Sequence, residues 1–363
     1  MRRSTGIKLA AAATLTALLG TTASASLALA NATDPAPPAR TVTTSTVVDG
    51  GIPAVVDPAA DLAAKTPGAH EEWADSIYFT SRVKARGHDI GLLVHTVRLP
   101  EGPGNLLLVS AHDATTGWYE SYATRFDEGD YSWSTQSLDI TAPGLRWTGN
   151  AERMSVSLDV PWGSLDLVLQ ARGPALNYGS TGAFTLFGHT NYEFALPDMR
   201  TTGTATIDGH TRHITGRSWL DRQWGPNVGA PGTHWSWMNF NMPNGDAVAI
   251  WDAVSPDGET DTWATVLRKD GSYEVASVEP LVDDASKFWT SPTTGQRYPT
   301  RWMVSIPSLD TRLSVRIVGN PGQEIVLGGN GRLEATARFE GTYDGARVSG
   351  KNFTEMFGDW PSS

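Results

Sequence analysis

Two acidic residues in tryptophan-rich segments are the candidates for acid–base chemistry. Asp221 lies within Trp219-Leu220-Asp221-Arg222-Gln223-Trp224-Gly225, and Asp252 follows Ala247-Val248-Ala249-Ile250-Trp251. Asp252, held among apolar side chains, loses hydration when it ionises, so we expect its pKa to be raised. Because a carboxyl that stays protonated can give its proton to an alkene, the pattern indicates proton transfer to carbon.

Both acids also have a structural interpretation. Asp221 could form a buried ion pair with Arg217 or Arg222 that fixes the junction between two domains. Asp252 could end its strand and cap the loop that begins before Ser255-Pro256. The sequence leaves both interpretations open.

Aromatic and polar side chains around the two acids could bind a flat or unsaturated ligand. On a strand over residues 219–225, Asp221 and Gln223 share one face, and Arg222 and Trp224 share the other. The segment 234–242 precedes an Asn244-Gly245 turn, which predicts a hairpin. Tryptophan offers a wide apolar face and one N–H donor, which suits the wall of such a pocket. The candidate ligand-binding residues are Arg222, Gln223, Trp224, His234, Trp235, Trp237, Asn239 and Trp251.

Several other chemistries are excluded. The chain has 0 Cys, so it forms no disulfide and has no thiolate nucleophile. Gly-x-Ser-x-Gly, P-loop, His-Glu-x-x-His and dinucleotide-binding patterns are absent. His210 and His213 flank an Asp208-Gly209 turn, where an exposed hairpin explains them without a metal. We therefore expect no metal and no cofactor.

The charge balance restricts the partners. The formal net charge is −11, so the chain offers no general attraction for nucleic acid. A hydrophobic small molecule is the expected partner, and the sequence leaves the oligomeric state open.

Hydrophobic alternation predicts that these residues lie on strands. Met154, Val156, Leu158 and Val160 alternate with polar residues, which is the period of a strand with one buried face. Similar alternation recurs along the chain, and Asn-Gly or Asp-Gly turns separate the segments. The sequence predicts an all-β, mostly antiparallel fold with two barrel-like or sandwich-like units.

The predicted organisation has four parts. Residues 1–30 have a basic start, a short apolar stretch and Ala-x-Ala sites, as in a secretory signal peptide, so we expect a secreted protein without a membrane span. Residues 31–68 are a Pro/Ala/Thr-rich leader. The two domains are predicted over residues 69–200 and 201–363.

Four separated pieces carry a family resemblance. They are Glu71-Glu72-Trp73 with Ile77-Tyr78-Phe79, the run from Tyr192 to Gly225, the Trp235-x-Trp237 hairpin, and Phe339-Glu340-Gly341 through Gly358. Together they resemble the superfamily of carotenoid 1,2-hydratases, kievitone hydratases and AttH-like proteins. The resemblance implies two lipocalin-like antiparallel β-barrel domains packed together, with a ligand pocket near their junction. It also implies that Asp252 is the proton donor and that Trp224 lines the pocket. Arg222 stands where carotenoid hydratases carry a histidine.

The function expected first is a secreted, cofactor-free hydratase-like lyase that adds water to an alkene of an isoprenoid or prenylated aromatic. Asp252 would protonate the alkene, Trp224, Trp237 and Trp251 would stabilise the cation, and Asp221, Gln223 or Asn239 would position water.

Three alternatives remain. The superfamily also contains Diels–Alderase-type cyclases, and Arg222 or Gln223 could polarise a carbonyl in a polyene cyclase or isomerase. A lipocalin-like carrier of a hydrophobic ligand would need no chemistry. A carbohydrate-active protein would use Asp221 and Asp252 as a carboxylate pair.

Overall fold

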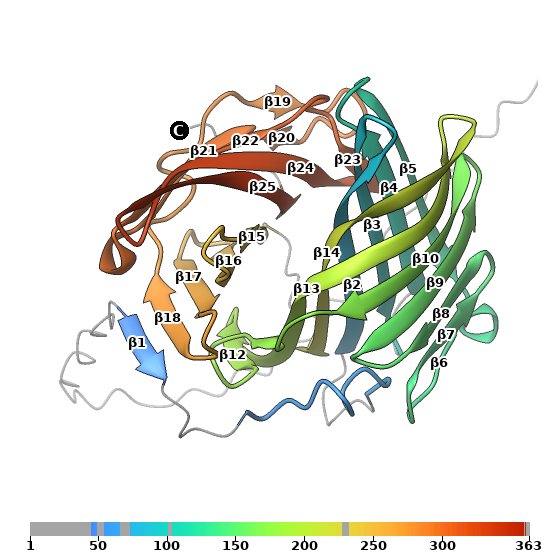
Figure 1. Cartoon of the computed structure of the whole chain (residues 1–363), viewed down its shortest axis with the longest axis horizontal. Helices are drawn as coiled ribbons and strands as arrows, with labels where there is room; N and C mark the ends of the chain where they lie inside the picture. Colours follow the sequence, from blue (N-terminus) through green and yellow to red (C-terminus); the bar gives the residue numbers. More distant parts are fainter. Residues whose placement is uncertain are drawn as a thin grey trace, which may run out of the picture. The chain divides into compact units, whose positions relative to one another are not determined.

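The computed structural model describes residues 45–48, 54–65, 73–100, 104–226, 232–358 and 360. The predicted signal peptide lies outside these residues, as does most of the leader. The described residues belong to one compact unit, Val42–Ser363, and nearly all regular structure in them is strand (Figure 1). No helix in these residues has the length and apolar character needed to cross a membrane.

The first sheet contains 13 antiparallel strands in the order β5-β4-β3-β2-β14-β13-β10-β9-β8-β7-β6, with β11 and β12 paired to β13. A 3-10 turn, η1 (Glu128–Asp130), precedes β6. The strands are β2 (Trp73–Ala85), β3 (His88–Arg98), β4 (Asn105–Asp113), β5 (Trp118–Phe126), β6 (Ser132–Trp133), β7 (Leu138–Ala142), β8 (Leu145–Gly149), β9 (Arg153–Val160), β10 (Gly163–Ala171), β11 (Leu176–Asn177), β12 (Ala183–Leu186), β13 (His189–Ile207) and β14 (His210–Pro226).

The second sheet contains 10 strands in the order β1-β18-β17-β16-β15-β25-β24-β22-β21, with β23 paired to β24. Its strands are β1 (Ser45–Val48), β15 (His234–Asn241), β16 (Ala247–Val254), β17 (Thr260–Leu267), β18 (Tyr273–Ser277), β21 (Arg301–Ile306), β22 (Thr311–Ile317), β23 (Glu324–Leu327), β24 (Asn330–Tyr343) and β25 (Ala346–Phe357). A separate pair, β19 (Trp289–Thr290) with β20 (Arg297–Tyr298), and a 3-10 turn, η2 (Pro307–Leu309), complete the described elements.

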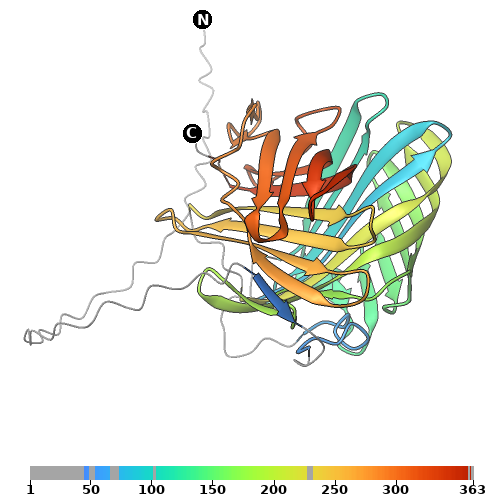
Figure 2. The same cartoon turned by 60° about the vertical axis from the view of Figure 1, so that its left-hand side comes forward.

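Both sheets curl, as Figure 1 and Figure 2 show for the cyan-to-yellow-green first sheet and the orange-to-red second sheet. The predicted all-β, antiparallel fold is therefore confirmed. In β9, buried and exposed residues alternate strictly, as the sequence predicts. Asp208 and Gly209 have φ values of 50° and 68°, which is the backbone that a tight hairpin turn requires between β13 and β14.

The chain passes from the first sheet to the second between β14 and β15. The predicted domain boundary between residues 200 and 201 falls inside β13 and so does not coincide with this passage. On both sides of that position β13 pairs with β14, and Arg200 lies opposite Gln170 of β10. Part of the leader also joins the fold: β1 pairs with β18, and Leu62 packs in the core of the first sheet.

Three groups of buried side chains follow from the alternation of the strands. One lies against the first sheet and includes Phe79 and Leu220, and a second lies against the second sheet and includes Ile250. The third draws side chains from both sheets, with Tyr78 from β2 and Trp251 from β16. Because neighbours in a strand point to opposite faces, a shift of one residue decides whether a side chain enters this shared third core.

Candidate functional site

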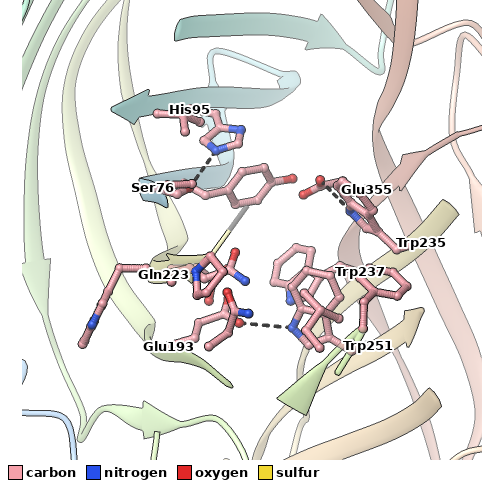
Figure 3. Close-up of a pocket in the computed structure, with 18 of the residues that line it drawn as sticks. Ser76, His95, Glu193, Gln223, Trp235, Trp237, Trp251 and Glu355 are labelled. Atoms are coloured by element: carbon pink, nitrogen blue, oxygen red, sulfur yellow. Dashed lines mark hydrogen bonds between the residues drawn. The ribbon is translucent and has the colours of Figure 1, made fainter. Parts of the chain in front are cut away.

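The shared core contains a pocket with a volume of about 140 Å³. Trp235, Trp237 and Trp251 of the second sheet form its aromatic side, and Tyr78 of the first sheet also lines it. Figure 3 shows these tryptophans facing Glu193 and Gln223 across the space. Of the predicted ligand-binding residues, five line the pocket: Gln223, Trp224, Trp235, Trp237 and Trp251.

Asp221 lines the pocket as a buried carboxyl, with 4% of the residue exposed. Its Oδ1 accepts hydrogen bonds from Trp219 Nε1 at 2.8 Å and from the Tyr178 hydroxyl at 2.9 Å. Burial raises the pKa of Asp221 well above its usual range, and the negative charge of Glu355 adds to this rise. The two hydrogen bonds oppose it, because they favour the carboxylate.

Glu193 is a second buried acid in the pocket, and the sequence analysis missed it. Its Oε2 accepts a hydrogen bond from Trp251 Nε1 at 3.2 Å (Figure 3). Burial raises the pKa of Glu193 well above its usual range, and the charge of Asp221 raises it further. Neither acid has an ion pair or hydrogen bond to Lys or Arg within the described residues.

The pairing of β13 with β14 brings these two acids to one face. Glu193 lies opposite Gln223, and Ala195 lies opposite Asp221, so the acids occupy diagonal positions across the strand pair. Such positions are separated by about 7–8 Å, close enough for charges to interact in an apolar site. Asp221 has two hydrogen-bond donors and Glu193 has one, so Asp221 is the better stabilised of the two as an anion.

Two acids of the second sheet, Glu334 and Glu355, lie beside the cation Arg332. Glu355 Oε1 accepts from Trp235 Nε1 at 3.1 Å and lies 3.5 Å from Arg332 Nη1. Glu334 Oε2 accepts from the Tyr78 hydroxyl at 2.7 Å, and its Oε1 lies 3.9 Å from Arg332 Nε. Burial raises the pKa of Glu334 well above its usual range, which Arg332 partly offsets.

Ser76 and His95 line the same pocket. His95 Nε2 lies 2.8 Å from Ser76 Oγ, and His95 Nδ1 lies 3.2 Å from Arg332 Nη1. Burial lowers the pKa of His95 well below its usual range, and the charge of Arg332 lowers it further. The imidazole is therefore neutral at physiological pH.

Asp252, the predicted proton donor, does not line this pocket, so the structure does not bring it together with Asp221. Trp251 points to the pocket, and Asp252, the next residue of β16, points with Ile250 toward the core of the second sheet. Its Oδ1 accepts from Thr262 Oγ1 at 2.6 Å, and burial raises its pKa to about 6. The strand continues to Val254, so Asp252 is not a loop cap either, and no Asp221–Asp252 carboxylate pair forms.

Arg222 is also outside the pocket. Its Nη2 donates to Asp75 Oδ1 at 2.6 Å, and its guanidinium also donates to the backbone oxygens of Asp61 at 2.9 Å and Ala63 at 2.8 Å. The guanidinium lies over the Trp133 ring at 4.6 Å and the Trp224 ring at 4.9 Å. A buried ion pair does exist here, but its acid is Asp75 and not Asp221.

Of the other predicted ligand-binding residues, Trp224 lies at the edge of the pocket, and Asn239 and His234 lie outside it. Trp224 borders the pocket, although its ring packs on Arg222. Asn239 does not line the pocket: its Nδ2 donates to Thr80 Oγ1 at 3.3 Å, and its Oδ1 accepts from the Phe353 N–H at 2.9 Å. His234 lies outside the pocket too, with its ring 5.3 Å from that of Trp360.

The fold and this pocket define a protein of the AttH-like class. The AttH-like family model matches residues 107–359, and the chain belongs to this family. The resemblance found in the sequence is therefore confirmed.

Two curated relatives have names that describe chemistry. The chain is 26% identical over 225 residues to Dehydratase asqC from Emericella nidulans, covering 57% of this chain and 62% of that protein. It is 24% identical over 212 residues to kievitone hydratase from Fusarium solani subsp. phaseoli, covering 55% and 58%. The chain thus spans about 60% of the length of the curated relatives that it matches.

Solved structures confirm the fold. Kievitone hydratase from Nectria haematococca superposes with a TM-score of 0.67 at 20% identity, covering 78% of this chain and 89% of that one. A Nitrosomonas europaea protein that carries the name AttH gives a TM-score of 0.71 at 18% identity, covering 87% and 100%.

Proposed function

We propose that the protein is a hydro-lyase that adds water to an alkene, or removes it from an alcohol, in a small hydrophobic substrate bound in the pocket between the two sheets. The observation that carries the proposal is the pair Glu193 and Asp221, two buried acids in a pocket with an aromatic wall. Among the described residues, neither of them has an ion pair with Lys or Arg. The names of the relatives, a dehydratase and a kievitone hydratase, support the same reaction class in its two directions.

Glu193 is the general acid in this proposal. Its proton moves to an alkene carbon, the π electrons form the new C–H bond, and the neighbouring carbon becomes a cation. The faces of Trp235, Trp237 and Trp251 stabilise the cation, because an aromatic ring has a negative face. No metal and no cofactor takes part.

Asp221 is the general base. Water attacks the cation and loses a proton to the Asp221 carboxylate, which Trp219 and Tyr178 keep oriented. The pair then holds its proton on Asp221, and return of that proton to Glu193 restores the starting state. Dehydration follows the same steps in reverse, because a site that catalyses a reaction in one direction also catalyses its reverse.

The substrate in this proposal is an isoprenoid or a prenylated aromatic. A branched alkene gives a tertiary cation, which the faces of the tryptophan rings can stabilise. Export through the predicted signal peptide is part of the proposal, and N-terminal sequencing of protein recovered from the medium would test it.

The test is mass spectrometry of the purified protein with prenylated flavonoids and short polyenes in ¹⁸O-labelled water. We expect one substrate to gain one labelled water molecule. Glu193→Gln should lower the rate by about 10²–10⁴-fold, the usual contribution of a general acid. Asp252→Asn, a buried acid of the second sheet that faces away from the pocket, is the matched control and should retain the wild-type rate.

Other products would point elsewhere. A product of unchanged mass with altered retention would replace hydration by cyclisation or isomerisation, and binding without any product would indicate a carrier. Full activity in Glu193→Gln would show that the acid is wrongly assigned.

A further inference from the structure

The hydrogen bonds around His95 determine which of its nitrogens carries the proton. Arginine has only donors, so the 3.2 Å contact requires His95 Nδ1 to accept from Arg332 Nη1. Because the ring is neutral, its one proton is on Nε2. His95 therefore donates to Ser76 Oγ, 2.8 Å away (Figure 3).

This direction leaves the Ser76 hydroxyl with a proton to give. The oxygen accepts from His95, and its own O–H has no acceptor among the described residues. Ser76 lines the pocket, so a bound ligand is the available acceptor.

We propose that Ser76 donates a hydrogen bond to an uncharged oxygen of the substrate, and that His95 and Arg332 are positioning residues that hold its hydroxyl in this role. The ligand is the substrate of the proposed hydro-lyase, so this inference rests on that function. It adds that the substrate carries a carbonyl or another neutral oxygen acceptor beside its alkene.

The charges of the pocket explain why the oxygen is uncharged. Asp221 and Glu355 line the same space, and an anionic group would be repelled by both carboxylates. Arg332 offers little compensation, because it already lies 3.5 Å from Glu355 and its guanidinium lies over the rings of Trp235 and Phe357. A carboxylate substrate is thus disfavoured.

A pair of probes tests the donor directly. Benzylideneacetone is a conjugated aryl ketone, and phenylbutene is the matching hydrocarbon without the carbonyl. Quenching of tryptophan fluorescence gives Kd for each. In Ser76→Ala we expect benzylideneacetone to bind about two- to tenfold more weakly, the net value of one hydrogen bond, and phenylbutene to be unaffected. Ser81→Ala changes another serine of β2, outside the pocket, and should alter neither Kd.

A second measurement tests the positioning residues and needs no turnover. ¹⁵N NMR of the wild type should show His95 neutral with its proton on Nε2. Arg332→Met removes the donor to Nδ1, so the ring should no longer hold one tautomer and the ketone should bind more weakly. Ser76→Ala should weaken binding of the ketone less in the Arg332→Met background than it does in the wild type.

Four outcomes would overturn the inference. The NMR spectrum could place the proton on His95 Nδ1, or the wild type could fail to bind the ketone. Ser76→Ala could also weaken the binding of both probes equally, or weaken the binding of neither. These outcomes are separable from failure of the proposed function. If no substrate is hydrated but the ketone preference depends on Ser76, the donor stands and the reaction is wrong.

Discussion

Arg222 and Asp221 are neighbours in β14, yet they lie in opposite electrostatic environments. Arg222 faces the core of the first sheet, where Asp75 and the backbone oxygens of four residues accept from it. Asp221 faces the pocket, where a neutral indole and a phenol are its donors and a second acid lies close by. Both side chains are almost fully buried.

The difference separates a buried charge that stabilises the fold from one that is available for chemistry. A buried ion with an opposite partner and satisfied hydrogen bonds holds its neighbours in place. A buried acid without a cation has a raised pKa and can exchange a proton near neutral pH. The three predictions below test this distinction, from the largest effect to the smallest.

Arg222→Met should lower the free energy of unfolding by about 3–5 kcal/mol, because it leaves Asp75 and four backbone oxygens without this donor. Each folded molecule should keep its activity, since Arg222 does not line the pocket. Urea unfolding and the rate per folded molecule are the measurements.

Arg98→Met is the matched control for this experiment. Arg98 Nη2 also donates to Asp75, at 2.6 Å, but 20% of the Arg98 side chain is exposed, so its loss should cost less. Equal losses in the two variants would contradict the distinction between a buried and a half-exposed partner.

Asp252→Asn should change how stability depends on pH. The pKa of Asp252 is raised to about 6 in the folded protein, against about 3.9 for an unfolded aspartate. The folded state then binds more protons between these values, so the wild type loses stability as pH rises from about 4 to about 6, by up to about 3 kcal/mol from this group.

The variant should lack this part of the decline and should be more stable than the wild type at pH 7. Urea unfolding at a series of pH values between 4 and 8 is the measurement. A variant whose stability falls with pH as steeply as that of the wild type would show that Asp252 is not the titrating group.

Alternation and turn residues predict that the candidate residues lie on strands and that adjacent residues point to opposite faces. The sequence separates Asp221 and Gln223 from Arg222 and Trp224, and in the structure the first pair lies in the pocket while Arg222 lies in the core. The same period of two could not say which face of β16 meets the other sheet. Trp251 and Asp252 are adjacent, and the choice of face decides which of them is in the pocket.

The place of Glu193 could not be found from local sequence for a different reason. Continuing the register from Ile207↔His210 would pair Glu193 with Trp224, but an irregularity between Leu196 and Met199 moves it opposite Gln223. That one-residue shift sets the diagonal relation of Glu193 to Asp221. The charge of Glu355 raises the pKa of Asp221 only because the two sheets are in contact, and no local sequence pattern encodes that contact.

The pH–rate profile gives the finest test of the two unpaired acids. The charge of Asp221 raises the pKa of Glu193. In the wild type the rate should rise with pH as the base Asp221 ionises, and it should fall at higher pH as the acid Glu193 loses its proton. Because the two acids are coupled, the apparent pKa values of the rising and falling limbs of the profile belong to the pair. Asp221→Asn removes the charge beside Glu193, so its pKa should fall.

The residual activity of Asp221→Asn should therefore lack the rising limb, and its falling limb should move to lower pH. Profiles of kcat/KM for the wild type and the variant, measured in ¹⁸O-labelled water, would show both changes. Asn239→Ala, a buried polar residue of the second sheet outside the pocket, is the control and should keep both limbs. A falling limb that stays in place would mean that Asp221 and Glu193 do not interact, and the pocket would then hold two independent acids and no proton-sharing pair.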